Sequence, residues 1–237
     1  MLFLDRTIST LPGNLALDEA LLLDAEAAGP EVLRVWEWRQ PAVILGAGGR
    51  LQDDINVDAC TLDNLPIARR SSGGGTVLLG PGCLVFSLVL RLNGPPELTN
   101  LHASYRFILG RLKRSLLPLA PGVELAGVSD LAIGGRKFSG NAQQRKQTHL
   151  LHHGTILYAM DLTSMSRYLK HPARQPDYRA QRGHAEFVGN IEVDVNVVKN
   201  ALREEWNAHD EMRSEPAALA DRLVAEKYGR DDWVRRR

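Results

Sequence analysis

Cysteine is scarce in this sequence, and long apolar runs are missing. The 237 residues include two cysteines, Cys60 and Cys83, whose spacing fits neither a C-x-x-C zinc pattern nor a disulfide framework. No apolar stretch approaches the roughly 18 residues of a membrane helix, so we expect no membrane span. The first residues reach the charged Asp5 and Arg6 too early for a secretory signal. We therefore expect a cytoplasmic protein.

Net charge is also nearly absent. The sequence has 29 basic and 28 acidic residues, for a formal charge of +1. Such a balance gives no reason to expect nucleic acid or an anionic membrane surface as a partner. The hydrophobic share of 44% and the charged share of 24% are ordinary for a folded domain. At this length we expect a single domain over residues 1–237, with a helical C-terminal segment from about 191 to 237.

Helical and strand patterns are interleaved along the chain. Apolar periodicity predicts helices over residues 14–27, 54–64, 98–118, 164–169, 193–209 and 215–228. It predicts strands over residues 32–38, 41–45 and 66–70, two more between 76 and 92, and a hairpin over 129–145 and 149–158. Because these elements follow no regular βαβ period, they indicate an α+β fold rather than a doubly wound sheet. The three arginines at the C-terminus are expected to be disordered.

Lysine is the rarer of the two basic residues, and one lysine has an unusual setting. Only six of the 29 basic residues are lysines. Lys137 lies at or near the bend of the predicted hairpin, between a Gly-Gly pair and Gly140, and glycines allow a ligand or another backbone to approach closely. A lysine at a strand edge is more often simply solvated. A second glycine-rich turn with basic residues at its start, over residues 69–76, favours a functional interpretation.

The two glycine-rich turns together predict an anion site. Consecutive backbone N–H groups in such turns form a concave set of donors for phosphate. The common nucleotide motifs do not fit, however. A G-x-x-x-x-G-K-[ST] phosphate loop requires lysine where Pro81 and Asn141 stand, and a G-x-G-x-x-G fingerprint from Gly46 requires glycine where Leu51 stands. The sequence therefore supports neither a P-loop nor a Rossmann scaffold.

Five segments of the chain stand in a distinctive order. They are an opening helix, an Arg-Arg-x-Ser-Gly-Gly-Gly turn, a Gly-Arg-Lys hairpin, a His-His-Gly-Thr strand and a proline-bounded basic loop. In this sequence they lie at residues 14–22, 69–77, 129–143, 152–155 and 172–179. In order and spacing they resemble the lipoate–protein ligase A family, which includes octanoyl- and lipoyl-transferases. The resemblance extends from about residue 14 to residue 190.

The resemblance implies both a fold and a reaction. The fold is the one shared with biotin–protein ligases and class II synthetases, a mixed central β-sheet flanked by helices, here as a single catalytic domain without the accessory domain of longer ligases. In the reaction, ATP with Mg²⁺ converts lipoate or octanoate to an acyl-adenylate, and the acyl group passes to a lysine of a carrier protein. The expected carriers are a lipoyl domain of a 2-oxoacid dehydrogenase, the glycine-cleavage H protein or another lipoate-binding protein. A separate accessory subunit is a further candidate partner.

The same resemblance assigns roles to individual residues. Lys137 is the catalytic residue, at the acyl carbonyl oxygen and the α-phosphate. Asp130 is the candidate ligand of Mg²⁺ or of the adenosine, with a turn-capping aspartate as the alternative. The residues assigned to ATP and the lipoyl-adenylate are Arg70, Ser72, Gly73, Gly74, Gly75, Thr76, Val77, Leu78, Lys137, Ser139, Gly140, Asn141, Ala142, His153 and Gly154.

Other residues in these segments have a structural as well as a functional interpretation. His152 and His153 share a predicted strand, so one is expected to face inward, and a core histidine is favoured over a catalytic base. Gly154 is expected to leave space for an acyl tail. Trp36 and Trp38 would line a ligand groove or pack in the core. The loop at residues 172–179 would form a lid, a docking surface for the acceptor or a solvated, salt-bridged loop.

Two departures from the family pattern leave the reaction type open. Many ligases have a Tyr-His-Asp-like sequence after the glycine turn, where this chain has Leu78-Leu79-Gly80. Transferases with this signature have a nucleophilic cysteine about fifteen residues before Gly-Arg-Lys, and residues 122–124 contain none. Cys60 is expected in the core, which leaves Cys83 as the thiol closest to the glycine turn in sequence.

Three hypotheses follow from these observations. The chain is an ATP-dependent ligase, an ATP-independent acyltransferase that uses one of its two cysteines, or a binding module that has lost turnover. The missing nucleophile favours the ligase.

Overall fold

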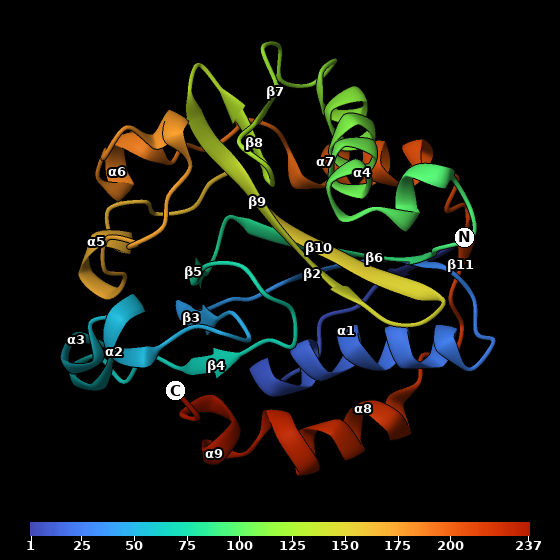
Figure 1. Ribbon diagram of the computed structural model, residues 1–237, viewed down its shortest axis with the longest axis horizontal. Coiled ribbons are helices and arrows are strands. Elements are labelled where there is room, and N and C mark those ends of the chain that lie inside the picture. Colours follow the sequence, from blue (N-terminus) through green and yellow to red (C-terminus); the bar gives the residue numbers. More distant parts are fainter.

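The central sheet of the computed structural model, which describes residues 1–237, is mixed (Figure 1). From edge to edge its eight strands are β11 (Asp210–Glu211), β1 (Leu2–Asp5), β2 (Val32–Glu37), β6 (Cys83–Arg91), β10 (His149–Leu157), β9 (Arg136–Arg145), β8 (Asp130–Ile133) and β7 (Glu124–Ala126). Strand β1 is parallel to β11 and β2, and the other pairs are antiparallel. The expected α+β fold with a mixed central sheet is confirmed.

A second, smaller sheet lies beside the first. It has three strands, with β3 (Ala42–Leu45) between β4 (Ile67–Arg69) and β5 (Val77–Leu79). Strand β4 runs parallel to β3, and β5 runs antiparallel to it. The glycine-rich turn at residues 70–76 connects β4 to β5, so both ends of the turn are fixed by the same sheet.

Helices cover both faces of the large sheet (Figure 1). Helix α1 (Leu11–Glu26) lies on one face, and α8 (Ala217–Leu223) packs on α1, while α4 (Leu101–Leu116) and α7 (Val195–Glu205) lie on the other face. The shorter helices are α2 (Leu51–Asp54), α3 (Val57–Leu62), α5 (Met165–Tyr168), α6 (His184–Phe187) and α9 (Asp231–Val234), with 3₁₀ turns at Pro96–Thr99 and Asp177–Arg179 and a π turn at Val224–Tyr228. No helix has both the length and the apolar character that a bilayer span requires.

The two-sided burial of the sheet explains its apolar sequence. Along β2, Val32 and Trp36 belong to the core on the α1 side, whereas Leu33 and Val35 belong to the core on the α4 and α7 side. Successive side chains of a strand point to opposite faces, so a strand covered on both faces is apolar at consecutive positions.

One charged residue, Arg34, interrupts this apolar strand and ties it to α1. Its side chain is fully buried, and Nη1 lies 2.6 Å from Oδ1 of Asp18. Nη2 donates to Oδ1 of Asn14 at 2.7 Å and to the carbonyl oxygen of Arg6 at 2.9 Å. The pair fixes the rotation of α1 on the sheet, and with it the direction in which Asp18 points.

His152 in β10 is the expected core histidine. It is fully buried beside Phe86, with Nδ1 3.1 Å from the amide nitrogen of Gln143 and Nε2 3.2 Å from Oδ1 of Asn141. Burial, with a smaller contribution from His153, lowers the pKa of His152 to about 3. The ring is therefore neutral across the physiological range, and it holds the side chain of Asn141 in place.

Capping residues explain most differences between expected and observed helix boundaries. Helix α1 begins at Leu11, three residues early, because Oγ1 of Thr10 accepts the N–H of Gly13 at 3.2 Å. The helix expected over 54–64 divides into α2 and α3, since Asn56 caps the second one. The helix expected over 98–118 begins at 101 for the same reason, with Asn100 as its cap.

The C-terminus differs most from expectation. The helix expected over 215–228 is α8 followed by the π turn, and α9 was not predicted. The expectation of a disordered tail was wrong. The Arg236 guanidinium donates to the carbonyl of Ala47, and the carbonyl of Arg237 accepts the N–H of Leu51 at 3.2 Å.

Removal of the Arg34 side chain should destabilise the fold strongly. In Arg34→Ala the Asp18 carboxylate stays buried without its cation, which typically costs about 3–5 kcal/mol of unfolding free energy. Urea unfolding of the wild type and the variant measures this loss. Arg230→Ala, which breaks the exposed pair between Arg230 and Asp232, is the control and should have no measurable effect. Equal stability of the two variants would contradict the role given to Arg34.

The buried neutral His152 predicts a loss of stability in acid. Its pKa is about 3 in the folded chain and about 6.5 when unfolded. The unfolded state therefore binds the extra proton first. The contribution of neutral His152 to the free energy of unfolding is complete above pH 6.5, and it falls by about 1.4 kcal/mol per pH unit as the pH drops toward 3.

The substitution His152→Gln removes the titrating group, so the stability difference between pH 7 and pH 5 should be smaller than in the wild type. Urea unfolding at the two pH values measures it. His171→Gln, at an exposed position, is the control. An unchanged pH dependence in His152→Gln would show that His152 does not titrate in this way.

Candidate functional site

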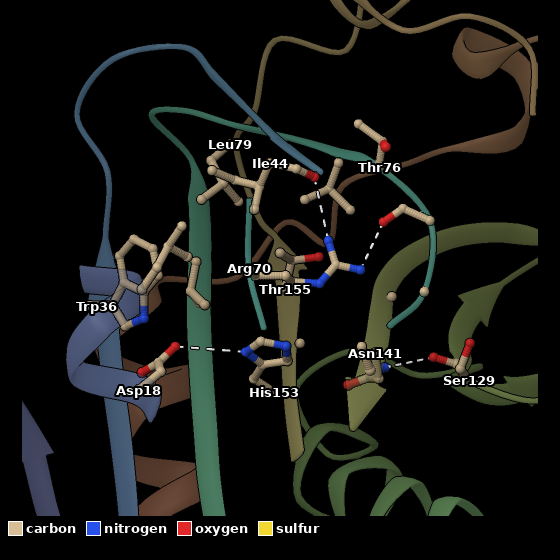
Figure 2. Close-up of a pocket in the computed structure, with 18 of the residues that line it drawn as sticks. Asp18, Trp36, Ile44, Arg70, Thr76, Leu79, Ser129, Asn141, His153 and Thr155 are labelled. Atoms are coloured by element: carbon tan, nitrogen blue, oxygen red, sulfur yellow. Dashed lines mark hydrogen bonds and ion pairs between the residues drawn. The ribbon is translucent and has the colours of Figure 1, made fainter. Parts of the chain in front are cut away.

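A cleft that is partly open to solvent lies between the glycine turn, α1, β9 and β10 (Figure 2). Its apolar lining residues are Leu15, Trp36, Ile44, Val77, Leu79, Val85 and Ala142. Its polar lining residues are Asp18, Arg70, Thr76, Ser129, Lys137, Asn141, His153 and Thr155. In Figure 2, Trp36, Ile44 and Leu79 lie on one side of Arg70, and Asn141 and Ser129 lie on the other. The cleft therefore joins an apolar wall to a polar, cationic one.

Arg70 is buried in this cleft without a carboxylate partner. Its Nε donates to the hydroxyl of Ser72 at 3.0 Å, and Nη2 donates to the carbonyl oxygens of Gly73 at 2.6 Å and Gly75 at 2.8 Å. Nη1 lies 3.4 Å from the carbonyl oxygen of Ile44. Burial lowers the pKa of Arg70 to about 10, which leaves the guanidinium charged at neutral pH. A buried cation whose partners are all neutral oxygens is suited to an anionic ligand.

Glycine is required where the backbones around Arg70 come close. Gly74 has φ of +86°, and a Cβ on it would lie 2.9 Å from Nη2 of Arg70. A Cβ on Gly46 would lie 2.1 Å from the carbonyl oxygen of Gly74. Larger residues at these two positions would push the turn away from the guanidinium that it surrounds.

Lys137 lies near the start of β9, just after the turn between β8 and β9. The turn residues Gly134 and Gly135 have φ of +56° and +73°. The ammonium Nζ of Lys137 pairs with Oδ1 of Asp130 at 2.8 Å and lines the cleft. A Cβ on Gly140 would lie 2.6 Å from this Nζ, so the glycine leaves room for the lysine side chain.

Asp130 is fully engaged by its neighbours. While Oδ1 pairs with Lys137, Oδ2 accepts the hydroxyl of Tyr178 at 2.7 Å. Burial and the adjacent carboxylate raise the pKa of Tyr178 far above its ordinary value, so the phenol stays protonated as the donor. No group of three or more His, Cys, Asp or Glu side chains is arranged to hold a metal ion. Asp130, the expected Mg²⁺ ligand, is therefore a single carboxylate that is already paired with Lys137 and Tyr178.

His153, unlike His152, faces the cleft. Its Nε2 is hydrogen-bonded to the hydroxyl of Ser72, and its Nδ1 lies 3.7 Å from Oδ2 of Asp18. Burial opposes ionisation of Asp18, but Arg34 and His153 outweigh it and hold the pKa of this carboxyl below its usual value. Oδ2 of Asp18 has no hydrogen-bond partner within the chain. Ser72, His153 and Asp18 thus connect the glycine turn to α1.

The structure gathers most of the predicted residues at this cleft. Those that line it are Arg70, Gly74, Gly75, Thr76, Val77, Lys137, Gly140, Asn141, Ala142, His153 and Gly154. Ser72 and Gly73 contribute through their bonds to Arg70, and Ser139 accepts from the amide of Asn141 at 3.2 Å. The side chain of Leu78 is buried in the core.

The space expected at Gly154 is already occupied. A Cβ on Gly154 would lie 2.1 Å from Oδ1 of Asn141 and 2.9 Å from the ring of Phe86. The glycine therefore makes room for Asn141, and the apolar wall of the cleft lies elsewhere.

Several lining residues were not predicted from the sequence as site residues. They are Leu15, Asp18, Ile44, Leu79, Val85, Ser129 and Thr155. The sequence pattern could have identified Asp18, because an aspartate one turn after Leu15 interrupts the apolar face of a helix. No sequence pattern identifies Ile44, Leu79 and Val85, since strand residues that line a cleft follow the same pattern as those in a core.

Neither cysteine reaches the cleft. Cys60 and Cys83 are both buried, and neither belongs to the lining residues. Burial raises the pKa of Cys83 to about 12, and burial followed by Asp63 raises that of Cys60. Neither thiol is therefore in the thiolate form that nucleophilic attack requires.

The loop after α5 lies over the hairpin. Besides the bond from Tyr178 to Asp130, Nη2 of Arg182 donates to the carbonyl of Gly135 at 2.9 Å. Arg179 is buried with its guanidinium 4.7 Å from the ring centre of Phe187. The loop thus covers the part of the hairpin that carries Lys137, and its individual arginines are partly structural.

Comparison with known sequences identifies relatives over the whole chain. The profile of the lipoyl protein ligase A/B catalytic domain matches residues 12–206. Octanoyltransferase LipM of Moorella thermoacetica is 27% identical, in an alignment that covers 99% of this chain and 97% of that protein. Lipoate–protein ligase 1 of Staphylococcus aureus is 28% identical over 77% of this chain and 54% of the ligase.

Solved structures show the same fold. A bipartite lipoate–protein ligase from Thermoplasma acidophilum matches with a TM-score of 0.84 at 24% identity, covering 99% of this chain and 95% of the other. A lipoate–protein ligase A bound with ATP matches with a TM-score of 0.82 at 25% identity, covering 99% and 98%. The chain therefore belongs to the lipoyl protein ligase A/B catalytic-domain family, whose members are enzymes named lipoate–protein ligase or octanoyltransferase.

Proposed function

We propose that this protein is an ATP-dependent lipoate–protein ligase. It joins lipoate or octanoate to AMP as an acyl-adenylate and then transfers the acyl group to a lysine of a lipoyl-carrier domain. The observation that carries the proposal is that two cations, Arg70 and Lys137, line the same cleft as an apolar wall. An acyl-adenylate has the matching parts, which are an anionic phosphate, a carbonyl and an aliphatic tail.

The proposed reaction has two half-reactions, and the oxygens of the α-phosphate take part in both. A carboxylate oxygen of the acid attacks the α-phosphorus of ATP, the bond to pyrophosphate breaks, and a mixed anhydride forms. The carrier amine then attacks the acyl carbon, AMP leaves, and the nitrogen loses a proton. In the first step negative charge concentrates at the α-phosphate and leaves with pyrophosphate, and in the second it grows on the carbonyl oxygen and then on the phosphate of the departing AMP. A cation about 4 Å away is worth about 4 kcal/mol at an effective dielectric near 20. The part of this interaction that appears only in the transition state accelerates the reaction.

The ion pair between Lys137 and Asp130 supports this proposal, because it holds the ammonium group of Lys137 in a fixed position. Asp130 keeps Nζ at 2.8 Å in the free protein, and Tyr178 fixes the carboxylate from its other side. We assign Asp130 to this positioning role, and no residue of this chain to a metal ion. Mg²⁺ would reach the cleft bound to the phosphates of ATP, as it commonly does.

Other residues in and beside the cleft match the other parts of the ligand. The backbone of residues 73–78 and the hydrogen-bonding side chains of Ser72, Asn141 and His153 would receive the phosphate and carbonyl oxygens. The apolar wall would receive the aliphatic tail, at about 0.8 kcal/mol for each buried methylene. An arginine in place of Lys137 would fill this site poorly, because its planar fork has a different shape and reach.

The proposed acceptors are lipoyl-carrier proteins. The related structure from Thermoplasma acidophilum concerns a bipartite ligase and its E2 lipoyl domain. By analogy, the candidates here are a 2-oxoacid dehydrogenase lipoyl domain, the glycine-cleavage H protein or another lipoate-binding protein. We propose residues 1–237 as the catalytic unit, with a separate accessory subunit as a candidate partner in adenylation. The proposed compartment is the cytoplasm, because the reaction consumes ATP.

An ATP-independent octanoyl or lipoyl transferase is the second candidate. It is favoured by the full-length similarity to octanoyltransferase LipM. Its thioester intermediate would need a reactive thiol near the acyl group. The buried positions of Cys60 and Cys83 argue against it.

Replacement of Lys137 by alanine should lower acyl transfer at least about 100-fold, because the positioned cation is lost. The assay is intact-mass analysis of a lipoyl domain incubated with enzyme, ATP, Mg²⁺ and lipoate, with and without candidate accessory proteins. Lys146→Ala, an exposed lysine at the far end of β9, should retain the wild-type rate. Full activity of Lys137→Ala would contradict the proposed role.

Replacement of both cysteines by alanine separates the two candidate reactions. The ligase account expects Cys60→Ala/Cys83→Ala to remain active and ATP-dependent, since neither thiol lines the cleft. Intact mass of the wild type after incubation with octanoylated carrier should show no acyl adduct on the enzyme. An adduct on Cys83, together with an inactive double variant, would establish the transferase instead.

A further inference from the structure

The last eleven residues, Lys227–Arg237, lie against the glycine-rich turn, and we name them the C-terminal strap. They comprise the end of the π turn, α9 and the final arginines. In Figure 1 the C-terminus lies beside β4, the strand that leads into the glycine turn. The strap lies outside residues 12–206, the part of the chain that matches the family profile.

Arg69, the neighbour of Arg70, connects the strap to the turn. Its side chain is fully buried, and it forms no ion pair with a carboxylate. Nη2 donates to the carbonyl of Val234 at 2.8 Å, and Nε lies 3.0 and 3.2 Å from the carbonyls of Val234 and Trp233. Nη1 donates to the carbonyls of Gly46 at 2.9 Å and Gly49 at 2.7 Å. The carbonyl groups at the end of α9 thus provide much of the solvation of a buried cation.

Trp233 completes the connection from the other side. Its indole Nε1 donates to the backbone carbonyl of Arg69 at 2.9 Å. The guanidinium of Arg236 lies 4.0 Å and the ammonium of Lys227 4.4 Å from the ring centre, so the ring is covered by two cations. Arg69 is therefore held through both its side chain and its backbone.

A second connection leads from the strap to Ser71 within the turn. Nζ of Lys227 and the hydroxyl of Tyr228 meet Oε2 of Glu19 at 2.6 and 2.7 Å. Oε1 of Glu19 accepts from the amide of Gln144 at 3.1 Å, and Gln144 in turn accepts the hydroxyl of Ser71. The two connections thus end at Arg69 and Ser71, on the N-terminal side of the glycines.

Two of the three glycines of the turn face open space. A Cβ placed on Gly73 or on Gly75 would find no atom within 4 Å. Glycines lose more conformational entropy on ordering than other residues do, so an unpacked glycine turn needs outside constraint. Arg70 provides part of this constraint through its bonds to the turn carbonyls, and its own backbone follows Arg69 directly.

We propose that the C-terminal strap orders the glycine turn for its anionic ligand, with Trp233 and Arg69 as positioning residues. The ligand, a nucleotide phosphate, rests on the proposed function, whereas the ordering of the turn does not. The bonds of the strap lead to Arg69, to the loop at residues 46–51 and, through Glu19 and Gln144, to Ser71, so it acts on the site through the backbone of the turn. Loss of the strap contacts frees the turn and weakens nucleotide binding while the sheet and its helices remain folded.

Hydrogen–deuterium exchange of the full-length chain tests the ordering without any assay of activity. In Trp233→Ala, peptides over residues 71–78 should exchange at least about fivefold faster than in the wild type, while peptides of α4 (Leu101–Leu116) should be unchanged. Trp233→Phe keeps an aromatic ring at this position but loses the N–H donor, so its exchange rate should fall between those of the wild type and Trp233→Ala. Arg230→Ala alters an exposed pair in the same strap and is the matched control. Unchanged exchange over 71–78, or uniformly faster exchange across the chain, would overturn the proposal.

Steady-state kinetics then test the effect on the ligand. Trp233→Ala should raise KM for ATP at least about fivefold and leave KM for the carrier unchanged, a separation that a general loss of folded protein would not produce. A fall in kcat alone, with KM for ATP unaltered, would contradict the positioning role. If the chain adenylates no acid at all, the proposed function fails, and the exchange measurement still decides whether the strap orders the turn.

Discussion

A buried guanidinium without a carboxylate partner is the constraint on which this site depends. Arg70 keeps its charge at neutral pH although burial lowers its pKa to about 10. The carbonyls of Gly73 and Gly75 and the hydroxyl of Ser72 solvate this charge without neutralising it. Only a turn that folds back on its own arginine can supply these oxygens, and only glycine permits that path at Gly74. The same arrangement leaves positive potential at the mouth of the turn, where an anion would complete it.

The fold brings distant parts of the chain to this cation. The turn between β4 and β5 carries Arg70, the hairpin of β8 and β9 carries Lys137, and the first helix supplies Asp18 and Leu15. The buried pair of Arg34 with Asp18 fixes that helix on the sheet. Polar groups therefore converge from a turn, a hairpin and a helix, whereas the apolar wall comes from strands and a helix that also form the core. A charged head and an aliphatic tail can be held together in such a cleft.

The sequence predicted the local features well, because their causes are local. Glycine-rich turns and apolar periodicity are visible within a few residues, and Arg70, Lys137 and His153 do meet in one cleft. The neighbours of Asp130 could not be predicted, since Tyr178 approaches it from a loop 48 positions away. Ile44 and Val85 resemble core residues in every local respect. The docked C-terminus depends on bonds to Arg69 that no periodicity reveals.

The central claim is that the cleft binds an anion joined to an aliphatic tail. Calorimetric titration with a non-hydrolysable octanoyl-adenylate analogue that has one negative charge in its linker tests it most directly. The comparison is an analogue of the same shape with a neutral linker. With Arg70 and Lys137 lining the cleft, the charged analogue should bind at least about 30-fold more tightly. Equal affinity for the two analogues would contradict the account.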